Sequence, residues 1–171
     1  YLERGSMSAG IVFVHHKYPL QLALDEVRNA EKSAKSNFGR NACCIKLLKN
    51  SGETRVIGFK WDERALVNNS ITLSEFFNKI VSLYREDKLS SKFAYDFMSV
   101  VNEISEQKEE VAKEILQKEL KRIYLHKTPA EKQDSQFLDN MLSIFDRWQY
   151  NFKDFANMFI VGRFISKNGM E

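Results

Sequence analysis

The sequence predicts an α+β fold in which a β-α-β-β part is followed by an all-α helical bundle. Two observations carry this prediction. Five of the seven glycines lie at or before Gly58, and the other two lie close to the end of the chain. The apolar residues also change their spacing, because near-continuous apolar runs in the first third give way to helical repeats from about residue 71. We therefore expect two parts, residues 8–70 and 71–171, that meet in the polar segment 68–70.

The first part contains a predicted helix between predicted strands. Residues 9–15 are apolar and rich in β-branched side chains, which is typical of a strand buried on both faces. Pro19 suits the first turn of a helix, and apolar residues then recur at helical spacing until Gly39. Two further strands are predicted over 42–48 and 55–61. A sheet of this size would be incomplete, because three strands leave edges that other elements usually cover.

The second part is predicted to be entirely helical. Thr72 and Glu75 have the spacing of a capping box, and the segment 128–131 signals a new helix or pair of helices over 136–166. Oppositely charged residues at i,i+4 spacing indicate a solvated outer face for the segment 103–127. We expect a bundle of four or five helices. Three aromatic residues near the end are compatible with either a core or an interface: Trp148, Tyr150 and Phe152.

Composition places the chain among ordinary globular proteins. The 171 residues include 26 Lys+Arg and 23 Asp+Glu, and the net charge of +3 neither demands nor excludes a nucleic-acid partner. The only cysteines, Cys43 and Cys44, are adjacent on a predicted strand, so their side chains point to opposite faces and are badly placed to form a disulfide. The absence of a disulfide favours a reducing, cytoplasmic setting. No apolar run approaches the ~20 residues of a membrane-spanning helix. Residues 1–7 lack a signal-peptide core and resemble an expression remnant.

Few residues suggest chemistry by their pattern alone. His15 and His16 have no zinc-like spacing to other ligands, so the simpler interpretation is a strand end that enters a loop. The more suggestive pair is Lys35 and Arg40, which flank Gly39 at the end of the predicted helix. An ammonium and a guanidinium at one end of a sheet suit a polyphosphate. The alternative is structural, because a lysine near a helix C-terminus and a glycine cap are both ordinary features.

The residues around these cations carry a resemblance to a known group. A strand that begins Ser8-Ala-Gly-Ile, followed by a helix and by Gly39-Arg-Asn, resembles nucleotidyl cyclase palm domains, the group that contains diguanylate cyclases. The longer stretches 8–20, 47–53, 88–96 and 162–169 are similar to the large subunit of type III-B (Cmr module) CRISPR RNA-guided effector complexes.

This resemblance implies a fold, a function and partners. Residues 8–70 would be the C-terminal part of a ferredoxin-like palm domain, and residues 71–171 would be a helical domain. The family converts ATP, with Mg or Mn, to cyclic oligoadenylates in antiviral defence. Lys35 and Arg40 would face the ATP phosphates, and Ser8 and Gly10 would lie beside the catalytic hairpin. The helical domain would dock on the small helical subunits near the CRISPR RNA and target RNA duplex.

The sequence also departs from the family. It contains neither the Gly-Gly-Asp-Asp hairpin that binds metals nor the His-Asp pair of the nuclease region, so we assign no catalytic or metal-binding residue. We expect the chain to be inactive by itself and to bind no cofactor tightly, because phosphoryl transfer depends on metal ions and positioning. Two alternatives stay open: a non-catalytic assembly module, and a fragment of a diguanylate-type signalling cyclase.

Overall fold

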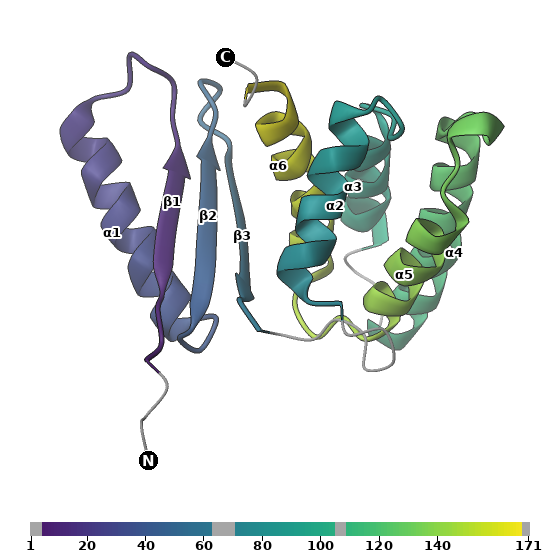
Figure 1. Ribbon diagram of the computed structural model, residues 1–171, viewed down its shortest axis with the longest axis horizontal. Helices are drawn as coiled ribbons and strands as arrows, with labels where there is room; N and C mark the ends of the chain where they lie inside the picture. The colour runs from purple at the N-terminus through teal and green to yellow at the C-terminus, as the bar shows by residue number, and fades with distance from the viewer. Residues whose placement is uncertain (1–4, 63–70, 105–108, 169–171) are drawn as a thin grey trace. The chain divides into compact units, whose positions relative to one another are not determined.

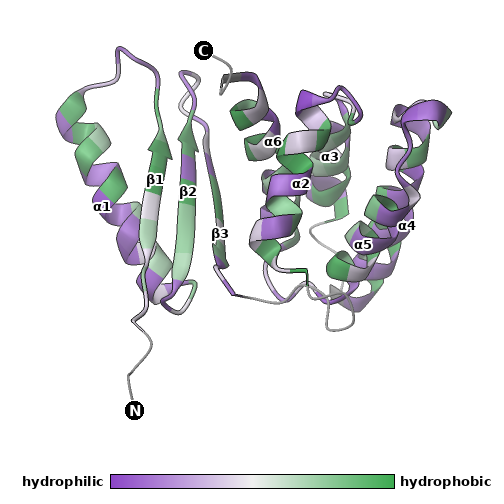
Figure 2. Ribbon diagram, in the orientation of Figure 1, coloured by the Kyte–Doolittle hydropathy of each residue, from purple (hydrophilic) through white to green (hydrophobic). Residues whose placement is uncertain are grey.

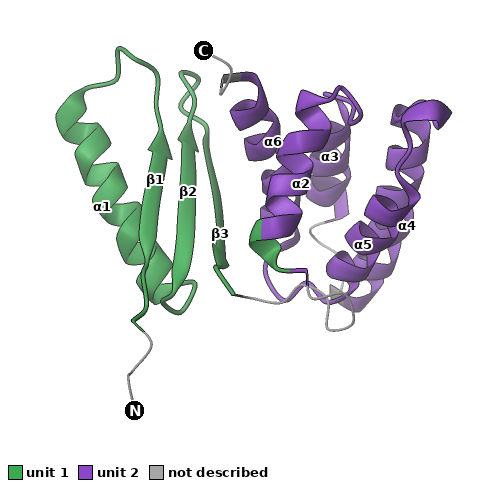
Figure 3. Ribbon diagram, viewed as in Figure 1, with its two compact units in different colours: residues 1–64, 72–74 green, residues 65–71, 75–171 purple. Residues whose placement is uncertain are grey.

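The computed structural model describes residues 5–62, 71–104 and 109–168 (Figure 1). The chain divides into two compact units, coloured separately in Figure 3. Unit 1 comprises residues 1–64 and 72–74, and unit 2 comprises residues 65–71 and 75–171. The predicted boundary at 68–70 lies outside the described residues.

Unit 1 has the predicted β-α-β-β order. Its elements are β1 (Ala9–Phe13), α1 (Leu20–Ser36), β2 (Ala42–Leu48) and β3 (Thr54–Lys60). The strands form one sheet in the order β1-β2-β3, with β1 parallel to β2 and β2 antiparallel to β3. The first strand ends at Phe13, two residues earlier than the apolar run predicted, and α1 provides the crossover that two parallel neighbours need.

Small residues let α1 lie close to the sheet. A Cβ atom on Gly10 would lie 2.4 Å from the backbone nitrogen of Glu31, so β1 and α1 meet almost backbone to backbone there. A buried cluster of alanines and one cysteine continues this contact: Ala30, Ala34, Ala42 and Cys44. On β3, the ring of Phe38 covers Gly58, because a Cβ at that position would lie 2.2 Å from the ring. These contacts fix where α1 ends relative to the start of β2.

Unit 2 contains five α-helices within the described residues, as predicted. They are α2 (Leu73–Arg85), α3 (Phe93–Ile104), α4 (Glu109–Lys127), α5 (Ser135–Asp146) and α6 (Phe152–Asn168). Helix α3 packs against α4 and α6, and α4 packs against α5. Figure 2 shows apolar residues along β1 and β2 of unit 1, whereas α4 of unit 2 is mainly polar. None of the described helices is both long enough and apolar enough to cross a membrane.

The predicted helix or pair of helices over 136–166 is confirmed as α5 and α6, but the Thr128-Pro129 signal does not itself begin a helix. Pro129 precedes a short 3-10 turn, Ala130–Lys132, and α5 begins only at Ser135. The N-cap of α5 is Asp134, whose side chain accepts a 2.9 Å hydrogen bond from the backbone nitrogen of Phe137. Pro129 therefore precedes one tight turn rather than an α-helix, and the carboxylate that caps α5 lies five residues later.

Aromatic side chains form the core of unit 2. Phe155 is fully buried, and its ring centroid lies within 7 Å of five other aromatic rings, those of Phe76, Phe97, Phe145, Trp148 and Phe159. Trp148 is buried, and its indole nitrogen donates a 3.0 Å hydrogen bond to the carbonyl oxygen of Asn151. The core interpretation therefore holds for Trp148.

Candidate functional site

The candidate site lies at one end of the unit 1 sheet. The strand register pairs Ala9 with Cys43 and Ala42 with Lys60, so β1 and β2 begin where β3 ends (Figure 1). Helix α1 also ends here, and its last turn is followed by the turn that leads into β2. Ser8, Arg40 and Lys60 are therefore brought to the same end of the sheet by separate segments of the chain.

Three successive residues with positive φ make the turn between α1 and β2. The φ angles are 76° at Gly39, 61° at Arg40 and 50° at Asn41. A left-handed conformation costs an arginine about 1 kcal/mol, so other contacts must hold it in place. The Arg40 backbone nitrogen donates to the carbonyl oxygen of Ala34 at 3.2 Å, and Asn41 Nδ2 donates to Asp62 Oδ1 at 3.1 Å. The turn is thus fastened to α1 on one side and to the end of β3 on the other.

The cations around this turn differ in their partners. Lys35, in the last turn of α1, pairs with Glu31, and the hydrogen bond from this lysine lowers the pKa of the Glu31 carboxyl. The exposed Arg40 and the partly buried Lys60 form no ion pair or side-chain hydrogen bond with any residue that the structure describes. Two cationic groups therefore have no carboxylate partner among the described residues and can bind an anion, whereas Lys35 would first have to give up Glu31.

The structure places the four predicted site residues differently. Ser8, Lys35 and Arg40 lie at the same end of unit 1, as a shared site requires. Gly10 lies one residue inside β1, and its missing side chain is what allows the backbone of α1 to approach. A packing role accounts for the glycine at this position, and its contact with a nucleotide remains a prediction.

Sequence reasoning missed Lys60. It is the last residue of β3, which was predicted to run one residue later, and no local motif marks it. Alternate residues of a strand lie on the same face of the sheet, so Lys60 lies on the same face as Gly58. In the structure Phe38 of the α1–β2 connection covers Gly58, so this face is the one that meets the connection.

The histidines and cysteines do not form a second site in the part of the chain that the structure describes. His15 and His16 stack with ring centroids 4.1 Å apart. Burial raises the pKa of the Cys43 thiol to about 11, so this thiol is protonated near neutral pH. Within the described ranges, no group of three or more His, Cys, Asp and Glu side chains is arranged to hold a metal ion.

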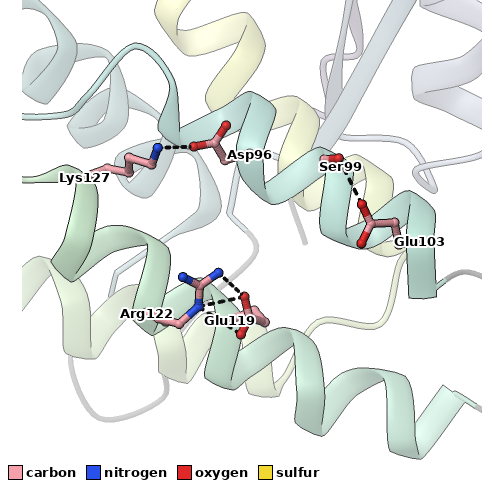
Figure 4. A network of polar contacts seen from close by, with 6 residues as sticks. All are labelled: Asp96, Ser99, Glu103, Glu119, Arg122 and Lys127. Atoms are coloured by element: carbon pink, nitrogen blue, oxygen red, sulfur yellow. Dashed lines mark hydrogen bonds and ion pairs between the residues drawn. The ribbon is translucent and has the colours of Figure 1, made fainter.

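A second group of charged residues lies between α3 and α4 in unit 2 (Figure 4). It borders a cavity of about 310 Å³. Lys127 Nζ lies 2.8 Å from Asp96 Oδ2, and the guanidinium of Arg122 makes a two-pronged contact with Glu119 at 2.9 and 2.6 Å. Both cations are thus neutralised by neighbours, which makes this face a weaker anion site than the turn in unit 1.

Comparison with known proteins supports the interpretation of unit 1. Residues 2–44 match the family model described as Cas10/Cmr2, second palm domain. The match covers about a quarter of the chain, including β1, α1 and the first residues of β2, and it begins ahead of Ser8 in the segment we expected to be an expression remnant. No curated protein and no solved structure matches the chain significantly. The matched segment, which folds as the first β-α-β part of unit 1, supports a fragment of the Cas10/Cmr2 large subunit of type III CRISPR.

Proposed function

We propose that unit 1 contributes to ATP binding for cyclic oligoadenylate synthesis in a type III CRISPR effector complex. The observation that carries this proposal is Arg40, an exposed guanidinium held by a fastened turn and left without an acidic partner among the described residues. A guanidinium donates several hydrogen bonds in a fixed plane, which suits the oxygens of a phosphate chain. Lys35 would join it after releasing Glu31, and Ser8 would lie beside the nucleotide at the start of β1.

The remaining parts of the reaction are assigned to the rest of the parent protein. ATP with Mg or Mn is the expected cofactor set, and the donor groups on this chain fit the phosphates, because they are cations, rather than the metal. The 171-residue chain incubated with ATP and either metal should therefore yield no cyclic oligoadenylate by mass spectrometry. Formation of product by the chain alone would contradict this division of labour.

The test of the proposal uses the assembled effector complex whose large subunit contains these residues. Arg40→Ala should raise the KM for ATP about tenfold, because a charge-assisted contact with the phosphate chain is lost. Lys35→Ala should have a smaller effect, since Lys35 gives up an ion pair in order to bind. Lys17→Ala is the matched control, because Lys17 is exposed in the loop at the opposite end of β1. Unchanged cyclic oligoadenylate synthesis in both site variants would overturn the proposal.

A second function, as an assembly module, is favoured by one face of α4. Val111, Ile115 and Leu125 are 49%, 39% and 40% exposed, and their spacing places them on one side of the helix. Lys118 and Arg122 lie on the same side, while the opposite side packs into unit 2 through Leu116, Leu120 and Ile123. An exposed apolar stripe that is interrupted by ion-paired Lys118 and Arg122 suits a helical protein partner. We propose that it docks on the small subunit of the complex, near the guide and target RNA.

The docking surface can be tested with the full chain and the purified small subunit. Ile115→Asp should weaken their association at least tenfold in isothermal titration calorimetry, because it places a charge in a buried apolar contact. Leu20→Asp is the control, since Leu20 is 74% exposed and belongs to unit 1. Equal affinities for both variants would contradict docking through α4.

A further inference from the structure

The side chain of Lys60 lies across the turn that carries Arg40. A Cβ atom built on Gly39 would lie 3.2 Å from Cε and 3.4 Å from Nζ of Lys60, so the ammonium group rests directly over this glycine. Lys60 belongs to β3, whereas Gly39 belongs to the connection between α1 and β2. The two meet because Lys60 is paired with Ala42 in the sheet, three residues after the glycine.

Lys60 could instead have a structural role at the C-terminus of α1. Carbonyl groups at the C-terminus of α1 attract cations, and Lys35 already occupies the last turn. If Lys60 served this purpose, its ammonium would be expected to donate to one of those carbonyls. In the described part of the chain it donates to none, and it makes no ion pair there either. Lys60 Nζ is not among the buried side-chain atoms that lack a partner, so water can solvate it and a bound anion can replace that water without an exchange of ion-pair partners.

Two acidic residues near the turn, among those that the structure describes, have other partners. Glu31 is paired with Lys35, and Asp62 accepts the hydrogen bond from Asn41. Neither carboxylate forms an ion pair with Arg40 or Lys60 in the described part of the chain, and Asp62, whose partner is a neutral amide, keeps its negative charge. Arg40 belongs to the turn itself, and the Lys60 side chain lies against Gly39, the residue before Arg40, so both cations belong to this end of the sheet, where an oligophosphate could contact them together.

We infer that Lys60 is a further phosphate-binding residue of this site and that it holds the oligophosphate chain of the nucleotide together with Arg40. The inference rests on the proposed function of unit 1 and adds to it a residue from β3. Gly39 belongs to the same arrangement, because any side chain at that position would meet the lysine and would have to adopt φ of 76°.

The test uses the ¹⁵N-labelled 171-residue chain and inorganic tripolyphosphate as the probe, without metal and at constant ionic strength. Amide chemical shifts in the turn report the dissociation constant. Lys60→Met keeps the length of the side chain and removes its charge, and it should weaken binding about tenfold. Lys60→Arg should restore binding to within about threefold, because it returns the charge. Lys17→Met is the control, and the melting temperature of each variant shows whether folding is unchanged.

The outcomes separate this inference from the proposed function. If Arg40→Ala weakens tripolyphosphate binding while Lys60→Met behaves like Lys17→Met, the role of Lys60 is overturned and the proposed function stands. If neither Arg40→Ala nor Lys60→Met weakens binding, the proposed phosphate site is overturned as well. If Lys60→Met lowers the melting temperature and Lys60→Arg binds no better than Lys60→Met, Lys60 has a structural role and the inference fails.

Discussion

The cations of the α1–β2 turn and those of the α3–α4 face are placed by different means. Arg40 and Lys60 are positioned by the backbone, through three residues of positive φ and the end of a strand, and no described carboxylate pairs with them. Arg122 and Lys127 are positioned by acids, which bind them at 2.6 and 2.8 Å (Figure 4). An ion pair satisfies the cation, whereas backbone positioning leaves its charge available.

This difference distinguishes two regions that the net charge of the chain does not distinguish. Both regions contain basic side chains, and in the described part of the chain Arg40 and Lys60 have no ion-pair partner, whereas Arg122 and Lys127 do. A ligand that approached Arg122 would have to compete with a two-pronged carboxylate contact. A basic side chain without an ion-pair partner therefore indicates a candidate anion site, whereas a basic side chain with such a partner is typical of a solvated helix face.

The largest expected effect comes from breaking the backbone contact that positions the turn. Gly10→Ala places a Cβ atom 2.4 Å from the backbone nitrogen of Glu31 and 2.8 Å from the carbonyl oxygen of Val27. Backbone atoms of α1 cannot move aside singly, so we expect unit 1 to lose about 3 kcal/mol of stability. Hydrogen exchange should show faster exchange throughout unit 1. Gly5→Ala is the control, because nothing lies within 4 Å of a Cβ there, and equal exchange in the two variants would contradict the backbone contact.

A smaller effect is expected when the turn itself is altered. Gly39→Ala forces an alanine to φ of 76° and brings its Cβ against Lys60, so the free energy of unfolding should fall by about 1.5 kcal/mol in urea denaturation. Gly52→Ala has a φ of 82° in open space and should show only the conformational cost. The difference between the two variants measures the contact with Lys60. Identical losses would mean that Lys60 moves aside freely.

The sequence was sufficient for the order of elements in unit 1. Near-continuous apolar strands and one helix with small residues on its inner face are local patterns, and the sheet order follows from them with a helical crossover. The start of α5 could not be read from Thr128-Pro129, because proline is equally at home in the 3-10 turn that it precedes. The Thr128-Pro129 pair suits both an α-helix start and a 3-10 turn, so this pair alone does not decide between them.

The candidate site could be predicted only in part. Lys35 and Arg40 are marked by a helix end and a glycine, which are features of one short segment. Lys60 comes close to them through strand pairing over eighteen residues of chain, and no spacing rule in the sequence reports such a contact. That Arg40 lacks an acid among the described residues, while Arg122 has one, is likewise a property of the folded arrangement.

An intermediate effect is expected at an acid that positions groups in unit 2. Asp134 caps α5 and pairs with Lys79 at 3.3 Å, and the hydrogen bond from Phe137 lowers the pKa of its carboxyl below the usual 3.8. Because the pKa of Asp134 is lower in the folded state than in the unfolded state, the charged carboxylate stabilises the fold fully when the pH is above the unfolded-state pKa. This stabilisation is lost as the pH falls through the pKa of the folded state. Asp134→Ala should therefore cost about 1 kcal/mol at pH 7 in urea denaturation, and this cost should shrink as the pH falls below 3.8 and through the lowered pKa of the folded state. Asp139→Ala is the exposed control on the same helix, and a cost for Asp134→Ala that persists at low pH would rule out the charged cap.

The smallest effect is expected from a cation that is already paired. Arg122 is 62% exposed, so removal of its contact with Glu119 in Arg122→Ala should lower the free energy of unfolding by about 0.5 kcal/mol or less. A double-mutant cycle with Glu119→Ala isolates the pair from other contacts of either residue. The same variant should leave tripolyphosphate binding unchanged, whereas Arg40→Ala weakens it. Equal weakening by both would show that pairing does not remove a cation from phosphate binding, because the carboxylate would then be exchanged at no measurable cost.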